Sequence, residues 1–146
     1  MRRERVEELY ERLDERFGTD LRSVGYYDAD GGDFAFIRDD VDEAYDEQEI
    51  SRAFRNLKLE AMDRPTLDSL YSHGDLLCTV RIHEEATVIH AATSDVDGAV
   101  ASVEAGVIGD LQGTVDLVLG VLAPAHTGMV NGSTVEDESS TVDESQ

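Results

Sequence analysis

The stretch CTVRIHEEATVIHAA, residues 78–92, contains two short runs in which apolar and polar residues alternate. Alternation with a period of two is typical of a β-strand with one buried face. The stretch therefore predicts a hairpin of strands 76–83 and 86–92 that turns at or near Glu84-Glu85. The apolar side of its first strand is expected to face the core: Cys78, Val80 and Ile82.

The hairpin carries two histidines, His83 and His90, and its register decides whether they face each other. Three short loops give His90 three different cross-strand partners. A loop of Ala86-Thr87 places His83 opposite His90, a loop of Glu84-Glu85 places Thr79 there, and a loop of Glu85-Ala86 places Arg81 there. A shift of one residue also changes which side chains share a face. The sequence leaves these three registers open.

The candidate ligand site of this hairpin consists of His83, His90 and Arg81. A catalytic zinc ion needs three protein ligands. Cys78 is expected on the face opposite His83, so it does not supply the third, and no metal site is predicted. The simpler interpretation is that both histidines are exposed or half-exposed residues of a sheet.

No motif predicts catalysis or a cofactor. The chain has no G-x-S-x-G nucleophile turn, and its one cysteine, Cys78, lies among apolar neighbours, where a thiol is normally inert. The run DADGGD, residues 28–33, lacks the spacing of a calcium-binding EF-hand loop. Gly109 and Gly113 do not form a G-x-G-x-x-G nucleotide fingerprint. We therefore expect a protein without catalytic residues.

Outside residues 78–92, hydrophobic spacing predicts further elements on both sides. A helix is expected over 3–17, from a stripe at helical period: Val6, Leu9, Tyr10, Leu13 and Phe17. A hairpin of 21–28 and 33–40 follows, with Tyr26, Tyr27, Phe34 and Phe36 either under the first helix or lining a pocket. The next helix, 42–62, has the stripe Ile50, Phe54, Leu57 and Ala61, with Asp40 or Asp42 as its cap. Pro65 is expected to start a brief separate helix.

A strand over 99–104 and a helix over 105–122 complete the predicted domain. The main stripe of that helix is Ile108, Leu111, Val115, Val118 and Leu122. Additional apolar residues lie off this stripe: Leu117, Leu119 and Val121. An apolar surface this wide indicates deep burial or a partner. We expect Leu117, Leu119 and Val121 to lie in an interface with a second copy or another protein.

The order α-β-β-α-(α)-β-β-β-α over residues 1–122 predicts an α+β sandwich with one five-stranded, mainly antiparallel sheet. In element order alone it resembles Roadblock/LC7 domains of the profilin-like group and PAS and GAF sensor domains. The segments GDLLCTVRIHEEATVIHAA (74–92) and VEAGVIGDLQGTVDLVL (103–119) resemble those of small, acidic proteins of halophilic archaea. These resemblances imply a fold and an environment and assign no residue a role.

The charge balance is strongly acidic, with 33 Asp and Glu against 12 Lys and Arg and a net charge of −21. Such a surface repels itself in dilute salt and is tolerated where salt screens it. Direct nucleic-acid binding is disfavoured because no basic stripe displaces counterions. A single cysteine and the lack of a long apolar run predict a cytoplasmic protein that is not embedded in a membrane. Residues 123–146 are predicted to form a disordered acidic tail.

Two functions are compatible with these patterns. The leading hypothesis is a non-catalytic regulatory or protein-interaction domain of a halophile that self-associates through its last helix. The alternative is a sensor that binds a small ligand or a metal on the face of the 78–92 hairpin.

Overall fold

The computed structural model describes residues 3–122; the tail predicted over 123–146 lies outside them. The elements are α1 (Arg3–Phe17), the 3-10 turn η1 (Gly18–Asp20), β1 (Leu21–Asp28), β2 (Gly31–Ile37), α2 (Asp39–Ala44), α3 (Glu47–Leu70), β3 (Thr79–Ile82), β4 (Ala86–Ala92), β5 (Gly98–Glu104) and α4 (Leu111–Leu122). The strands form one antiparallel sheet in the order β2-β1-β5-β4-β3. This confirms the predicted α+β class. No helix within residues 3–122 is both long and apolar enough to cross a membrane.

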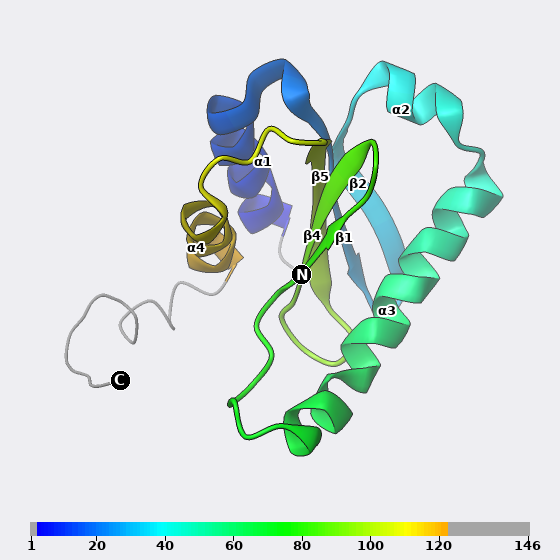
Figure 1. The fold of residues 1–146 in the computed structure, drawn as a ribbon. Coiled ribbons are helices and arrows are strands. Elements are labelled where there is room, and N and C mark those ends of the chain that lie inside the picture. Colours follow the sequence, from blue (N-terminus) through cyan, green and yellow to red (C-terminus); the bar gives the residue numbers. More distant parts are fainter. Residues whose placement is uncertain (1–2, 123–146) are drawn as a thin grey trace.

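Helices α1 and α4 lie side by side on one face of the sheet, and α3 crosses the other face (Figure 1). The face under α1 and α4 has a continuous apolar core, here called the dry face. Its buried residues include Val6, Leu9 and Leu13 of α1, Val118, Val121 and Leu122 of α4, and Ile89, Ala101 and Val103 of the sheet. The α1 residues recur at the spacing that places them on one side of a helix, as the sequence predicts.

The α3 face has a smaller apolar cluster near β1 and β2. It consists of Phe54, Leu57 and Ala61 of α3 with Tyr27 of β1. Phe54 lies directly over Gly32, where a Cβ atom would overlap its ring. The first half of α3 is therefore packed closely on the β1–β2 hairpin. Its second half passes over β4, where Glu60 bonds His90 and Arg64 bonds the Ala92 carbonyl.

The single helix predicted over 42–62 is wrong in its boundaries. The structure has α2 and α3 instead, and the cap of α3 is Asp46, not Asp40 or Asp42. Asp46 and Glu49 form a reciprocal capping box, with the Glu49 amide donating to Asp46 Oδ1 at 2.8 Å. Pro65 starts no new helix, because α3 continues through it to Leu70.

The last helix also begins later than predicted, at Leu111 instead of residue 105. Gly106 has a φ of 80°, which ends the extended chain in a turn. Asp110 then caps α4, since its Oδ1 accepts from the Gly113 amide at 2.9 Å. Ile108 therefore lies in the connecting loop, although it still packs against the dry-face core.

Candidate functional site

The register of the β3–β4 hairpin positions His90. Thr79 pairs with His90, and the His83 amide donates to the Ala86 carbonyl at 2.8 Å, so the loop is Glu84-Glu85. This is the second of the three registers open from the sequence. His90 and Thr79 therefore share the α3 face, while His83 lies exposed beside the turn.

His90 is the centre of a chain of polar contacts across the α3 face. Its Nε2 lies 2.5 Å from the hydroxyl oxygen of Tyr27, and its Nδ1 lies 3.0 Å from Glu60 Oε1. The second carboxylate oxygen of Glu60 accepts from Arg81 Nη1 at 2.5 Å. The chain thus joins β1, β4, α3 and β3, and its middle is deeply buried, with His90 only 4% exposed.

The ionised Glu60 carboxylate sets the direction of every hydrogen bond in this chain. It only accepts, so His90 carries a proton on Nδ1 and donates it to Glu60. His90 Nε2 then accepts from the Tyr27 hydroxyl. Each donor meets an acceptor, as buried polar groups require.

Burial fixes the protonation states of this chain. It lowers the pKa of His90, against the opposing effect of Glu60, so the ring is neutral at pH 7. It also raises the pKa of Tyr27 well above its usual value of 10, and Tyr27 is fully buried. Although tyrosine, histidine and a carboxylate are in line, the hydroxyl is not accessible to a substrate. The chain therefore positions side chains and offers no exposed nucleophile.

A cavity of about 270 Å³ lies between the second half of α3 and strands β3 and β4. Most of its wall is apolar, and its polar residues include Glu60, Arg81 and His90 of the chain above. The lining residues are Glu60, Ala61, Asp63, Arg64, Leu67, Leu76, Leu77, Cys78, Thr79, Arg81, His90 and Ala92. Burial raises the pKa of the Cys78 thiol to about 11, so the thiol is protonated and unreactive at neutral pH.

The structure brings together two of the three candidate residues of the hairpin. Arg81 and His90 line the cavity, and His83 does not. The expectation that both histidines are exposed or half-exposed holds for His83 and is wrong for His90. Ile82, expected in the core, is 78% exposed at the end of edge strand β3. Cys78 and Val80 pack partly against the dry-face core, as predicted.

Sequence reasoning missed Glu60 and Arg64 as parts of the site, and it named Tyr27 as a possible pocket residue without linking it to His90. The aromatic residues of the first hairpin were expected under the first helix or in a pocket. Phe36 does stack on Tyr10 of α1, but Phe34 packs on Phe54 of α3. A signal for Arg64 exists in the sequence. It occupies the next position of the stripe Ile50, Phe54, Leu57 and Ala61, where an apolar residue would continue the pattern.

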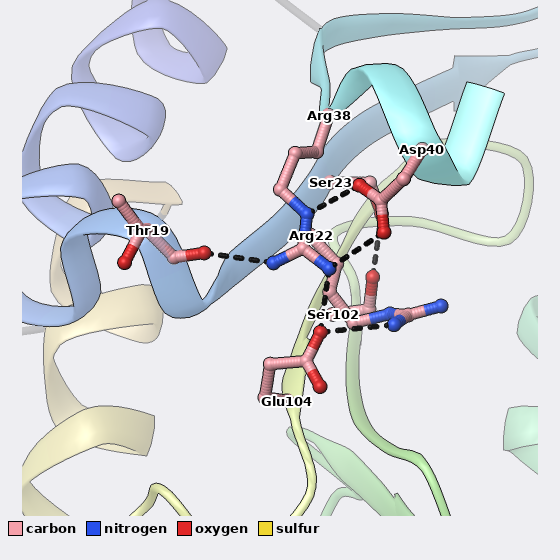
Figure 2. A network of polar contacts seen from close by, with 7 residues as sticks. All are labelled: Thr19, Arg22, Ser23, Arg38, Asp40, Ser102 and Glu104. Atoms are coloured by element: carbon pink, nitrogen blue, oxygen red, sulfur yellow. Dashed lines mark hydrogen bonds and ion pairs between the residues drawn. The ribbon is translucent and has the colours of Figure 1, made fainter. Parts of the chain in front are cut away.

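A second polar cluster lies at the other end of the sheet (Figure 2). Arg38 donates to both oxygens of Asp40 at 2.6 and 3.0 Å, to the Thr19 carbonyl at 2.7 Å and to Glu104 at 2.6 Å. Arg22, at a register shift between β1 and β5, donates to the same Glu104 oxygen at 3.1 Å. Arg38 lowers the pKa of Asp40, and Arg38 and Arg22 together lower the pKa of Glu104. The two arginines of this cluster are paired with its two carboxylates, so we interpret the cluster as a structural one that holds strand ends together.

The predicted interface residues of the last helix differ in burial. Val121 is 6% exposed and belongs to the dry-face core, so it is not available to a partner. Leu117 and Leu119 are half-buried against the same core. Within residues 3–122, no group of three or more His, Cys, Asp or Glu side chains is placed to hold a metal ion.

Comparison with known protein families gives a match over most of the chain. A family model described as a domain of unknown function (DUF7522) matches residues 7–123, which include every residue of the cavity. No curated protein matches the chain.

Proposed function

The chain belongs to the DUF7522 family, and we propose that it is a non-catalytic domain that binds a small molecule in the cavity under α3. The observation that carries this proposal is the combination of an apolar wall with a fixed polar end. Small-molecule sites are typically concave and mostly apolar, with a few placed polar groups that orient the ligand. The proposal keeps Arg81 and His90 from the hairpin site and replaces His83 with Glu60 and Arg64.

The size of the cavity supports a small ligand. A cavity of roughly 150 Å³ accommodates benzene in another protein. By the same proportion, 270 Å³ has room for about ten or eleven non-hydrogen atoms. The polar chain from Tyr27 to Arg81 holds one end of this space in a fixed arrangement. A preorganised site loses little entropy on binding, which favours affinity for a ligand this small.

A cavity-filling substitution tests the proposal. Leu67→Trp places an indole in the cavity, while Leu59→Trp places the same group on the exposed side of α3. The chain has no tryptophan of its own, so the emission of each variant reports whether its indole is buried. In a ligand-observed NMR screen of chemically diverse fragments, wild type and Leu59→Trp should bind a common set that Leu67→Trp loses.

Two outcomes of this screen count against the proposal. One is that no fragment binds the wild-type protein. The other is that fragments bind all three proteins equally although the indole of Leu67→Trp is buried. Circular dichroism of each variant verifies that loss of binding does not reflect loss of fold.

Self-association through α4 is a second proposal, favoured by the 46% exposure of Leu111 and the incomplete burial of Leu117 and Leu119. Light scattering in molar salt tests it with Leu119→Asp. A dimer that the substitution converts to a monomer supports an interface on α4. A wild-type protein that is already monomeric removes the proposal. The net charge of −21 supports the further proposal that the protein works in a salt-rich cytoplasm.

A further inference from the structure

Arg64 is a charged residue of the cavity wall, and no carboxylate within residues 3–122 is ion-paired with it. It is half-buried in the second half of α3, and its Nη1 donates to the Ala92 carbonyl of β4 at 2.6 Å. A guanidinium has five N–H donors. The bond to Ala92 anchors the group and leaves most of these donors for another acceptor.

The second arginine of the cavity, Arg81, is occupied in a different way. Its Nη1 donates a hydrogen bond to Glu60 Oε2, and the other oxygen of Glu60 is hydrogen-bonded to His90 Nδ1. Glu60 therefore neutralises Arg81 and uses both oxygens within the polar chain. The charge of Arg64 is not balanced in this way. At this end of the cavity, the two positive charges of Arg64 and Arg81 meet the one negative charge of Glu60.

Asp63 is the other carboxylate of the cavity lining, and its side chain is exposed. It precedes Arg64 in the helix, and adjacent helical residues do not face each other. The solvent around an exposed carboxylate weakens its effect on the interior. Of the charged residues that line the inner end, Arg64 therefore keeps a positive charge that neither Asp63 nor Glu60 balances.

We propose, resting on the ligand-binding function above, that the ligand is a small organic carboxylate whose acid group binds Arg64 and whose apolar body lies against Leu67, Leu76 and Cys78. A carboxylate matches the fork of a guanidinium and accepts two parallel hydrogen bonds. The apolar part of the cavity then takes a chain or ring of the size given above. A cation is disfavoured there because it would meet two arginines.

The experiment compares two probes of equal size. 3-Phenylpropanoate and 3-phenylpropanamide each have about eleven non-hydrogen atoms, which suits the cavity, and they differ in charge. Calorimetric titrations at pH 7 and one fixed KCl concentration use wild type, Arg64→Gln, Arg64→Lys and the control Arg55→Gln. Arg55 is exposed on the same helix and does not line the cavity.

The wild-type protein should bind the carboxylate at least about tenfold more tightly than the amide, as expected for a charge-assisted hydrogen bond. Arg64→Gln should reduce this ratio to within about twofold, and Arg64→Lys should give an intermediate ratio because lysine keeps the charge and loses the fork. Arg55→Gln should keep the wild-type ratio. Should Arg64→Gln not fold, Arg64→Lys still tests the geometry.

Three results would overturn the assignment of a carboxylate. They are equal binding of the two probes by wild type, an unchanged ratio in folded Arg64→Gln, and no binding of either probe. In each case, fragments that bind wild type and are lost in Leu67→Trp would leave the small-molecule function standing. The two proposals can therefore fail separately.

Discussion

The dry face and the α3 face are built on the same five strands and differ in what fills them. Under α1 and α4 the sheet presents Ile89, Ala91 and Ala101 to leucines and valines. Under α3 the alternate residues of the strands include Tyr27, which packs on the apolar residues of the helix, and His90, which bonds Glu60 of the helix. The apolar contact with α3 is concentrated in Phe54, Leu57 and Ala61.

Strand β4 shows how one segment serves both faces. Ile89 and Ala91 point into the dry face, while His90 and Ala92 line the cavity. Because side chains alternate along a strand, the dry-face core and the cavity wall are separated by a single residue step. We interpret the dry face as the part that holds the fold and the α3 face as the part that is free to bind.

The largest effect is expected on the dry face. Leu13→Ala removes a side chain that is 1% exposed in a closely packed core, and should lower the free energy of unfolding by about 2–5 kcal/mol. Leu59→Ala, at a site 56% exposed on α3, should change it by less than about 0.5 kcal/mol. Urea denaturation measures both. Equal losses would contradict the assignment of stability to the dry face.

A smaller effect is expected from the polar chain. Tyr27→Phe keeps the ring and removes the hydroxyl that donates to His90, which leaves a buried acceptor without its donor. The cost should be about 1–3 kcal/mol in the same denaturation experiment. Tyr45→Phe, at an exposed site, is the control. If the two substitutions cost the same, the hydroxyl contributes nothing to the α3 face.

The smallest effect is a pH dependence specific to His90. The unfolded chain takes up this proton near pH 6.5, and the folded protein does so only at lower pH, because burial lowers the pKa of His90. The unfolded state therefore binds more protons below pH 6.5. The stability that comes from burying His90 as a neutral ring is fully present above that pH and is lost as the pH falls. The free energy of unfolding then decreases by at most about 1.4 kcal/mol per pH unit.

His90→Gln removes this titration and should flatten the dependence between pH 6.5 and 5, measured by denaturation at several pH values. The lowered pKa values of Asp40 and Glu104 act in more acidic solution, below their ordinary values of 3.8 and 4.5. An unchanged slope in His90→Gln would show that His90 is not buried as a neutral ring. His83→Gln, at an exposed site, is the matched control.

The sequence predicts most of the dry face, because its signals are local. The spacing of Val6, Leu9 and Leu13 and the alternation of the strands are properties of short segments. The errors lie at helix ends, where several acidic residues compete as caps. Asp40, Asp42 and Asp46 are all suitable by type, and Asp46 is selected by its reciprocal bond with Glu49.

The sequence predicts less of the candidate site, because the site depends on contacts between distant segments. Glu60 and His90 are 30 positions apart, and Tyr27 and His90 are 63 apart. Their meeting requires both the hairpin register and the direction in which α3 crosses the sheet. The 78–92 hairpin identified Arg81 and His90 as candidates, and only the fold supplied their partners.

The most direct test of the account uses alanine methyl groups on the two faces. Ala61 and Ala92 line the cavity, while Ala91 and Ala101 lie in the dry-face core. In a methyl NMR titration with 3-phenylpropanoate, the signals of Ala61 and Ala92 should move together along one saturable curve. Those of Ala91 and Ala101 should stay in place. Equal movement on both faces, or movement only on the dry face, would contradict a ligand site under α3.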